Sequence, residues 1–413
     1  SGGREHALAW QCASFNIVEH VFVAPGNAGT SLEEKISNIE IESSEIEALI
    51  EFAINEAIDI TIVGPEAPLI AGIVDDFRAH DLTIFGPTQA ASQLEGSKVF
   101  CKDFLNRNNI PTAFYKVFTE PERAISYVKE KGAPIVIKAD GLAAGKGVIV
   151  AKTEQEAFEA IDDMLKGNRF GDAGSRVVIE EFLVGEEASF IVMVDGKNVS
   201  PMATSQDHKA RDNADKGPNT GGMGAYSPAP VVNPSIFDDV MKNIIQKTVD
   251  AMSAEGSPYT GFLYAGLMIN NGKAKVLEYN CRFGDPETQP IMMRLKSNLA
   301  QLCLLATQGK LDEATIEWDE RISLGVVLAA NGYPNDYKKG EKIIVPVDSG
   351  DAKIFHAGTK LESNNIVSNG GRVLCATALG SSIQEAQKRA YELVDRVDWH
   401  GSYYRTDIGF KAL

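Results

Sequence analysis

The sequence predicts a multidomain protein of mixed α/β and α+β class, with a parallel α/β domain at its amino-terminal end. Its 413 residues are enough for two to four domains, each with its own hydrophobic core. The first hundred residues alternate short apolar runs with helical patterns, which is typical of a parallel sheet. Two later regions, residues 112–183 and the segment from 322 onward, group strands around one or two helices, as α+β domains do.

The composition argues against several classes of protein. Asp and Glu number 57 against 40 Lys and Arg, a formal net charge of −17, so nucleic acids and anionic membranes are disfavoured as partners. A small phosphate ligand remains compatible with this charge, because a few cations and backbone N–H groups make a local positive pocket. The five cysteines are scattered and form no CxxC pair, which disfavours a disulfide framework or a zinc site and predicts a cytoplasmic protein. No apolar run is long enough to cross a bilayer, and there is no signal-peptide pattern.

The first domain is predicted to form part of a binding cleft. Apolar runs at 20–24, 59–63 and 82–85 are predicted strands, and each is followed by a loop with Gly and Pro. Ligands of parallel sheets lie beyond the carboxyl ends of the strands. A simple turn explains any one of these loops, but three together favour one rim of a cleft.

The middle of the chain is predicted to contain a compact α+β unit. Strands are expected at 134–138, 147–151 and 176–181. Two capping-box patterns predict the starts of helices, namely Thr119 with Glu122 and Thr153 with Glu156.

The region that follows contains a long polar segment between predicted regular elements. The elements are strands at 188–194, 261–270 and 273–280 and a helix at 234–254. The polar, glycine-rich loop Ser205–Tyr226 has a length that favours a lid over a site. His208 within it is expected at the surface, without a catalytic role. From 322 onward the chain is strand-rich, with one helix opened by Ser382 and Glu385.

The segment Ile135–Val148 is the most informative. A buried strand leads to Lys138, and a loop of small residues that includes Gly141 and Gly147 carries Lys146. Glycines let backbone N–H groups approach an anion, while two ammonium groups neutralise a polyphosphate. The segment departs from a Walker A loop, which disfavours P-loop and kinase-like functions. Taken alone, an ordinary glycine turn with two surface lysines explains the segment equally well.

A second segment, Val177–Glu187, runs from a strand into acidic residues and a glycine. This pattern fits a hinge whose backbone pairs with adenine and whose carboxylate holds ribose hydroxyls. A solvated acidic strand end is the stronger interpretation of the segment taken alone.

A third segment places polar residues along a strand with apolar flanks. Because alternate side chains of a strand share a face, Glu278 and Asn280 point the same way. Oxygen ligands at this spacing suit a hard cation such as Mg²⁺. Arg282 follows on the same side and suits a carboxylate or phosphate. An ion pair across a surface strand is the less favoured alternative, since each of these polar groups needs a partner.

The order of these motifs resembles the ATP-grasp superfamily, and their residues are similar to those of the glycinamide ribonucleotide synthetase family. The similar stretches run nearly end to end: 2–7, 25–30, 64–69, 138–147, 205–208, 217–228, 277–289 and 404–409. The resemblance implies a Rossmann-like domain over 1–97, a two-lobed ATP-grasp domain over 98–315 with its small lobe at about 115–185, and a small α+β domain over 316–413.

The resemblance also implies a reaction, the ATP-dependent ligation of glycine to 5-phosphoribosylamine in purine biosynthesis. ATP first phosphorylates glycine, and the amine then attacks the glycyl phosphate, giving glycinamide ribonucleotide, ADP and phosphate. Positioning and charge neutralisation carry such a reaction without an enzyme nucleophile. The implied cofactor is Mg²⁺ or Mn²⁺, and the implied partners are these small molecules, with no nucleic acid or membrane. A monomer or weak dimer is expected.

The resemblance implies a role for each matching residue. ATP binding is implied for Lys98, Lys138, Gly141, Lys146, Gly147, Glu180, Glu181, Phe182, Leu183 and Glu187. Metal binding is implied for Glu278 and Asn280, and a catalytic role at the glycine end and the transferring phosphoryl group for Asp207, Arg282 and Asp285. A phosphoribosylamine pocket is implied for Gly2, Gly3, Asn27, Gly29 and Glu66.

Two features depart from the family pattern. The chain opens at the turn Ser1–Arg4 without the family's preceding strand, so we expect the sequence to start inside a longer natural one. The strand 264–268 carries no acidic residue, so phosphate and water are expected to complete the metal shell.

Three alternatives stand beside this interpretation: another ATP-grasp ligase, a catalytically silent nucleotide-binding protein, and one part of a larger multifunctional purine enzyme. The Gly-Pro-Glu-Ala-Pro loop at 64–68 favours the glycine ligase over the first. The presence of Lys138, Lys146, Glu278 and Asn280 argues against the second.

Overall fold

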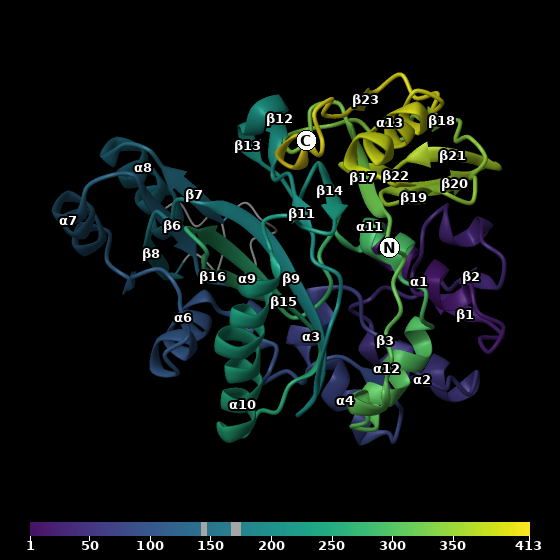
Figure 1. The fold of residues 1–413 in the computed structure, drawn as a ribbon, viewed down its shortest axis with the longest axis horizontal. Coiled ribbons are helices and arrows are strands. Elements are labelled where there is room, and N and C mark those ends of the chain that lie inside the picture. Colours follow the sequence, from purple (N-terminus) through teal and green to yellow (C-terminus); the bar gives the residue numbers. More distant parts are fainter. Residues whose placement is uncertain (142–146, 167–174) are drawn as a thin grey trace.

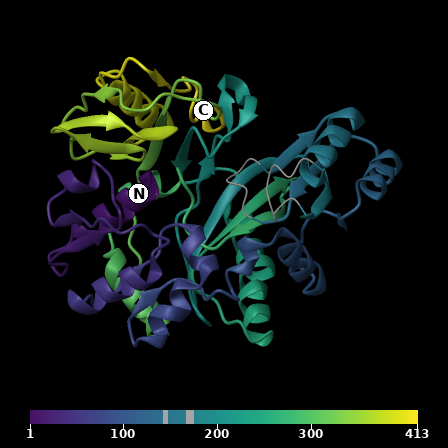
Figure 2. The same ribbon diagram turned by 180° about the vertical axis from the view of Figure 1, so that it is seen from behind.

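The computed structural model describes residues 1–141, 147–166 and 175–413. A small lobe lies at one end of the molecule, and a long sheet extends from it toward the N-terminal and C-terminal regions at the other end (Figure 1). The view from behind shows the same order, with the N-terminal region below the C-terminal region (Figure 2). The mixed multidomain class predicted from the sequence is confirmed.

The N-terminal region contains short parallel strands surrounded by helices. β1 (Val21–Val23) pairs with β2 (Ile36–Asn38), and β3 (Thr61–Ile62) pairs with β4 (Ile84–Phe85). Parallel pairing is therefore as predicted, although the described residues form two separate pairs. The helices are α1 (Gly3–Ala13), η1 (Thr30–Leu32), α2 (Ile46–Asn55), α3 (Glu66–Ala71), α4 (Ile73–Ala79) and α5 (Gln93–Gly96).

The small lobe is an antiparallel sheet covered by helices, and α6 (Lys98–Arg107) leads into it. The strand order is β5–β8–β6–β7, with bounds Tyr115–Phe118, Val177–Glu181, Ile135–Ala139 and Val148–Ala151. Thr153 caps α8 (Glu154–Leu165) as predicted, because its hydroxyl accepts the Glu156 N–H. The predicted Thr119 cap is wrong: α7 (Pro121–Lys131) starts one residue later, at a proline that suits the first helical position.

The large lobe has a long antiparallel sheet in the order β10–β9–β15–β16. The strands are β9 (Glu186–Asp195), β10 (Val199–Pro201), β15 (Thr260–Asn270) and β16 (Lys273–Asn280). The predicted helix at 234–254 consists of α9 (Pro234–Val240), a π-helical turn η4 (Met241–Ile245) and α10 (Gln246–Ala254). Further along lie α11 (Thr288–Arg294), α12 (Leu299–Thr307) and η5 (Leu311–Glu313).

The polar stretch at 205–226 is more regular than a loop. It contains β11 (Gln206–Asp207), β12 (Ala210–Asp212), η3 (Asn213–Asp215), β13 (Lys216–Asn219) and β14 (Gly224–Ser227). β12 and β13 form a hairpin, while β11 and β14 join the sheet of the C-terminal region. The prediction of an irregular loop is therefore wrong, because residues distant in sequence supply the pairing partners.

The C-terminal region is strand-rich with α13 (Ile383–Val394), as predicted, and Ser382 caps that helix. Its main sheet runs β11–β14–β17–β22–β19, with β23 beside β17. The remaining strands form the small sheet β18–β21–β20. The bounds are β17 (Ile322–Ala330), β18 (Lys342–Ile343), β19 (Ala352–His356), β20 (Thr359–Glu362), β21 (Asn365–Ser368), β22 (Arg372–Gly380), β23 (Ser402–Tyr403) and η6 (Phe410–Ala412).

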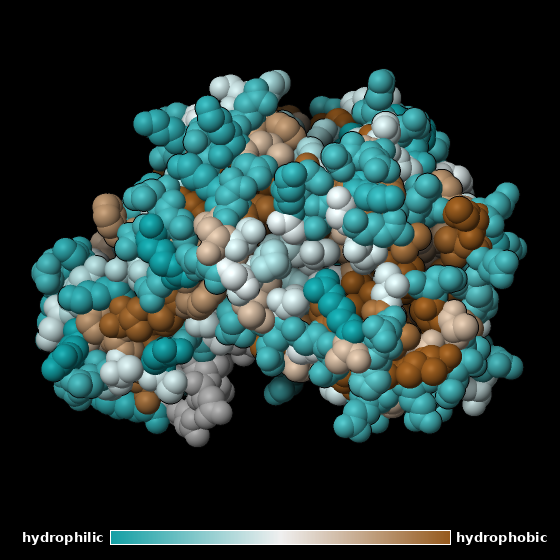
Figure 3. All heavy atoms as spheres, turned by 90° about the horizontal axis from the view of Figure 1, so that it is seen from below, coloured by the Kyte–Doolittle hydropathy of each residue, from teal (hydrophilic) through white to brown (hydrophobic). Residues whose placement is uncertain are grey.

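The hydrophobic cores follow these regions unequally. The small lobe has a core of its own, which includes Ile137, Ile161 and Ile179. The N-terminal region instead shares its core with the large lobe, where Phe77 and Leu263 belong to one cluster. The five cysteines are all buried and none forms a disulfide. Hydrophilic and apolar patches alternate on the face seen from below (Figure 3), and no described helix is long and apolar enough to span a membrane.

The small-lobe core is testable by shortening a fully buried side chain. Ile161→Ala should lower the free energy of unfolding by about 2–5 kcal/mol, because it removes buried methyl groups and leaves a cavity. Ile17→Ala is the matched control, since Ile17 is 73% exposed. The check is urea unfolding followed by a probe in the small lobe, and an equal effect of both variants would contradict the assignment of this core.

Candidate active site

Strand β16 places two uncommitted oxygen ligands on one face. Glu278 and Asn280 are both half-buried, and within the described part of the chain neither side chain has a hydrogen bond or ion pair. β16 pairs with β15 next to them, with Gly266 opposite Glu278, so the backbone around the pair is fixed. Two free oxygen ligands at a strand spacing of two fit a hard divalent cation.

Cationic side chains from several elements surround Glu278. Burial raises the pKa of this carboxyl group, but the opposing charges of Lys209, Lys138, Lys98 and Arg282 outweigh burial and lower the pKa below its ordinary value. Glu278 is therefore ionised at neutral pH. A group of cationic side chains around a carboxylate is suited to bind a polyanion together with a metal cation.

The first lysine of the glycine loop, Lys138, is held by a buried carboxylate. Its Nζ lies 2.9 Å from Glu180 Oε1 and donates to the carbonyl of Leu277 at 3.3 Å. Glu180 also pairs with Lys102 at 2.8 Å, and Glu180 and Lys102 are each 2% exposed. Lys102 was missed in the sequence because nothing in its helical context distinguishes it from a surface lysine. The Glu180 carboxylate is thus already bound by two lysines of the protein itself.

Two more of the predicted nucleotide residues, Lys98 and Gly147, form contacts near the end of β6. Lys98 donates to the carbonyl of Gly141 at 3.1 Å, and the Gly147 carbonyl accepts the Ala139 N–H at 2.8 Å. Lys146 falls within 142–146 and lies outside the described residues.

The acidic segment forms the expected connection between β8 and β9. Glu181 pairs with Lys275 of β16 at 2.9 Å, which ties the small lobe to the large lobe. Phe182 is 39% exposed and Leu183 half-buried, so apolar surface remains uncovered there. Glu187 pairs with Lys209 at 2.7 Å.

Arg282 joins two regions of the site. Its Nε lies 3.2 Å from Glu66 of the N-terminal region, and its Nη2 lies 2.9 Å from Glu95. Arg4 approaches Glu66 as well, at 3.9 Å. Because Glu66 was assigned to one substrate pocket and Arg282 to the other end of the reaction, this contact brings the two predicted groups together. Glu95 was missed, since its partner is nearly two hundred residues away.

Asp285 is held by a residue of the C-terminal region that the sequence did not suggest. Nη2 of Arg372 lies 3.1 Å from the Asp285 carboxylate, and Nη1 donates to the carbonyls of Asp285 and Gly221, each at 2.6 Å. Gln289 donates to Asp285 at 2.9 Å, and its own Oε1 is buried without a hydrogen-bond partner among the described residues. Arg372 therefore connects the Gly-Asp-Pro turn to the glycine-rich stretch.

Three of the predicted phosphoribosylamine residues, Gly3, Asn27 and Gly29, lie where the N-terminal and C-terminal regions meet. Asn27 donates to the carbonyl of His356 at 2.8 Å, and the Gly2 N–H donates to Glu5 at 2.6 Å. Gly3 starts α1. Gly29 packs so closely against His6 and His356 that a side chain has no room there.

Asp207 has the most unusual carboxyl group of the predicted site. Burial raises its pKa from 3.8 to about 7; Lys209 opposes this effect, and the negative charges of Glu287 and Glu187 add to it. His208, next to it, is fully buried and not on the surface as predicted, because its ring fits between Tyr226 and Phe410.

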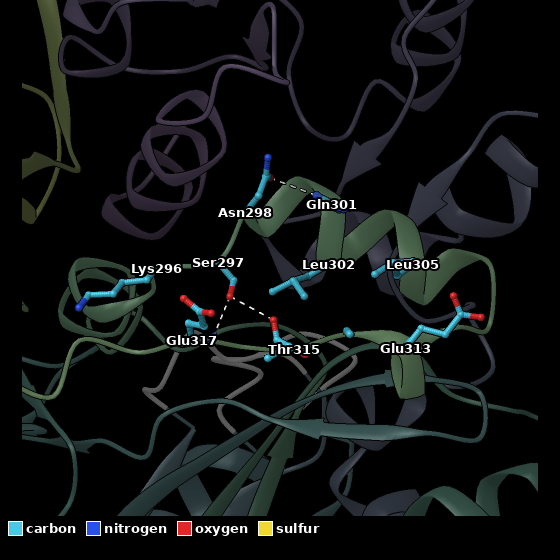
Figure 4. A pocket seen from close by; sticks show the side chains of 10 residues that line it. Lys296, Ser297, Asn298, Gln301, Leu302, Leu305, Glu313, Thr315 and Glu317 are labelled. Carbon is cyan, nitrogen blue, oxygen red and sulfur yellow. Dashed lines mark hydrogen bonds between the residues drawn. The ribbon is translucent and has the colours of Figure 1, made fainter.

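A separate pocket of about 310 Å³ lies away from these residues, between the start of α12 and segment 313–317. Figure 4 shows that its lining combines Lys296 and Leu302 with Glu313 and Glu317, while Asn298 points away from it. It contains none of the predicted site residues.

The pKa of Asp207 is testable through the pH dependence of stability. Because the folded protein holds this proton more tightly than the unfolded chain, the contribution of Asp207 to the stability of the wild-type protein should fall as the pH rises from about 4 to 7. Asn carries no charge, so the unfolding midpoint of Asp207→Asn relative to the wild type should increase over that window. Thermal unfolding without nucleotide measures this difference, with the exposed Asp59→Asn as control. Parallel curves for Asp207→Asn and the wild type would rule the shift out.

Family comparisons divide the chain into three matching parts. The N domain of phosphoribosylglycinamide synthetase matches residues 1–95, its ATP-grasp (A) domain matches 96–288, and its C domain matches 323–411.

Two curated relatives are similar over the whole chain. A phosphoribosylamine–glycine ligase of Vibrio cholerae is 65% identical over 416 residues, which cover 100% of this chain and 97% of the relative. One of Escherichia coli is 64% identical over 417 residues with the same coverage.

Solved structures agree with these relatives. The crystal structure of a phosphoribosylamine–glycine ligase from Thermotoga maritima superposes with a TM-score of 0.86 at 36% identity, covering 99% of this chain and 98% of that one. A biotin carboxylase from Campylobacter jejuni shares the fold, with a TM-score of 0.74 at 14% identity over 97% of this chain and 91% of that one. The chain belongs to the phosphoribosylglycinamide synthetase family, whose central domain is an ATP-grasp domain.

Proposed function

We propose that the protein ligates glycine to 5-phosphoribosylamine with ATP, giving glycinamide ribonucleotide, ADP and phosphate. The observation that carries this proposal is the pair Glu278 and Asn280, which has no side-chain partner among the described residues and is surrounded by lysines and an arginine. Beside this pair, Arg282 contacts the carboxylate of Glu66 in the N-terminal region. The chain is also 65% identical to a named ligase. The arrangement offers a polyphosphate site next to a second substrate site. A domain division at 97/98 and 315/316 is part of the same proposal.

The chemistry proceeds in two transfers. A glycine carboxylate oxygen attacks the γ-phosphorus of ATP, the bond from that phosphorus to the β–γ bridging oxygen breaks, and ADP leaves. The amine of phosphoribosylamine then attacks the carbonyl carbon of glycyl phosphate. The amine loses a proton, the carbon–oxygen bond to phosphate breaks, and the amide forms. Each transition state gains from fixed positive charge and from alignment, so no covalent enzyme intermediate is required.

We assign the nucleotide to the region between the small lobe and the large lobe. Lys98, Lys138 and Lys146 would neutralise the phosphates, with the loop glycines Gly141 and Gly147 allowing close backbone approach. The connection from Glu180 to Leu183 would pair with adenine through its backbone, since the Glu180 carboxylate already binds two lysines. Glu187 would hold the ribose, exchanging its contact with Lys209 for sugar hydroxyls.

Glu278 and Asn280 would hold Mg²⁺ as a pair of oxygen ligands, with Mn²⁺ as an alternative ion. A bound divalent ion supplies charge neutralisation on the β- and γ-phosphates. Arg282, Asp285 and Asp207 are proposed to act near glycine and the transferring phosphoryl group. The pocket for phosphoribosylamine is proposed around Gly2, Gly3, Asn27, Gly29 and Glu66.

The decisive assay measures ADP release with MgATP, glycine and freshly made phosphoribosylamine, omitting each component in turn. We expect release to require all of them. A requirement for a different carboxylate or amine would keep the ATP-dependent ligase and replace its substrates. The absence of release with every combination would overturn the proposal.

Removing the metal ligand tests the assignment of Glu278. Glu278→Ala should abolish MgATP-dependent turnover while leaving the fold intact, because the cation loses the charged member of its pair of protein ligands. Glu186→Ala is the matched control, since Glu186 lies exposed at the start of β9. Turnover is measured together with circular dichroism, which checks the fold. Near-normal turnover of Glu278→Ala would contradict the assignment of Glu278 as a metal ligand.

Arg282→Lys tests whether a planar, forked cation is needed. A single ammonium cannot reach Glu66 and Glu95 with the geometry of the guanidinium nitrogens, so kcat/KM should fall by about tenfold or more. Steady-state kinetics at saturating MgATP provide the measurement. A variant within twofold of the wild type would remove Arg282 from the site.

A further inference from the structure

The last residues of the chain are fastened to the β12–β13 hairpin. Arg405 has no exposed surface, and its Nη1 donates to the Ala210 carbonyl at 3.1 Å and pairs with Asp215 at 2.8 Å. Its Nε and Nη2 bind both oxygens of Asp407, at 2.8 and 2.9 Å. Figure 1 shows the C-terminal end of the chain beside these two strands. A fully buried guanidinium with so many partners holds its neighbours in one arrangement.

The same segment maintains an unfavourable backbone in the hairpin turn. Ala214 and Asp215 have positive φ angles of 57° and 52°, a left-handed conformation that is uncommon for residues with a side chain. The Ala214 N–H donates to Asp407 at 2.7 Å, and Lys411 pairs with Asp215 at 2.8 Å. Such a turn persists when surrounding contacts determine it, and here the C-terminal residues provide those contacts.

His208 carries the contact from the C-terminal segment to the candidate site. The Gly409 N–H donates to His208 Nε2 at 3.1 Å, and the ring is fully buried against Phe410. Burial lowers the pKa of His208 to about 3, with the positive charges of Lys411 and Arg405 as further causes, so the ring is neutral and free to accept this hydrogen bond.

The neighbours of His208 lie in the candidate site instead of on the C-terminal segment. Lys209 pairs with Glu187 and influences Glu278, and Asp207 is surrounded by the charges of Glu287 and Glu187. The backbone of His208 is fixed on both sides, since its N–H donates to Gly224 and its carbonyl accepts from Met223. The ring contact with Gly409 and these two backbone hydrogen bonds together fix the residue that lies between Asp207 and Lys209.

We propose that residues 403–411, acting through His208, are a positioning element for the ligase reaction. They hold the segment from 206 to 219 so that Asp207 and Lys209 meet the substrates at the large-lobe side of the site. This role rests on the proposed function. It also makes the hairpin a fixed wall attached to the C-terminal region, in place of the lid predicted from the sequence.

Two substitutions at one position separate positioning from mere packing. His208→Leu keeps an apolar side chain of similar size but removes the acceptor for the Gly409 N–H. His208→Gln supplies an amide oxygen at about the place of Nε2 and restores it. We expect His208→Leu to lower kcat/KM for glycine by about tenfold or more, and His208→Gln to recover to within about threefold of the wild type.

Gln387→Leu is the matched control. Gln387 donates to the Ile408 carbonyl at 2.8 Å from α13, so the variant loses a hydrogen bond to the same segment without touching the hairpin. We expect wild-type kcat/KM from it. Where His208→Leu does not fold, Tyr403→Phe provides the test, because it removes the hydrogen bond of 2.7 Å to Asp212 and leaves the ring in place; a smaller loss in the same direction is expected.

Hydrogen exchange of the amides at 205–219 measures positioning without turnover. Faster exchange in His208→Leu than in Gln387→Leu supports the positioning role. This holds even if the protein releases no ADP, because that outcome contradicts only the proposed function. Unchanged exchange and unchanged kcat/KM in His208→Leu would overturn the positioning role. Equal loss in Gln387→Leu would overturn it too.

Discussion

The buried carboxylate of Glu180 connects the parts of the chain on which the site depends. It lies between Lys102 of α6 and Lys138 of β6, at 2.8 and 2.9 Å, and Lys138 reaches on to the carbonyl of Leu277, next to Glu278. Charges held this deeply are costly unless each has a partner in good geometry, so the three side chains have little freedom to separate. The orientation of the small lobe relative to Glu278 and Asn280 follows from this contact, and from Lys275 with Glu181 beside it.

Local patterns predicted most of the regular structure. Thr153 and Ser382 cap helices because their side chains act on N–H groups three residues away, which a sequence displays directly. The strand carrying Glu278 and Asn280 was predicted at 273–280, and it forms over the same bounds. The pattern at Thr119 had the right residues in the wrong place, because Pro121 sets the helix start more strongly than a hydroxyl does.

The parts that could not be predicted depend on contacts between distant segments. Lys102, Glu95 and Arg372 gain their meaning only from partners far along the chain, so each looks like an ordinary charged residue in the sequence. His208 was taken for a surface residue for the same reason, since the aromatic rings and the Gly409 N–H that cover it come from another region. The glycine-rich stretch appears irregular in sequence and becomes paired strands once β17 lies beside it.

The placement of the cysteines makes thiol labelling a measure of the opening of the hydrophobic cores. The five thiols are those of Cys12, Cys101, Cys281, Cys303 and Cys375. Burial raises the pKa of each of them, so the native protein presents no reactive thiolate. Cys101 and Cys281 belong to the core shared by the N-terminal region and the large lobe, and the other three belong to a second core outside the small lobe. The core of the small lobe contains no cysteine. A pulse of maleimide or iodoacetamide therefore alkylates only molecules in which one of these two cores has opened. Fluctuations confined to the small lobe leave every thiol unlabelled.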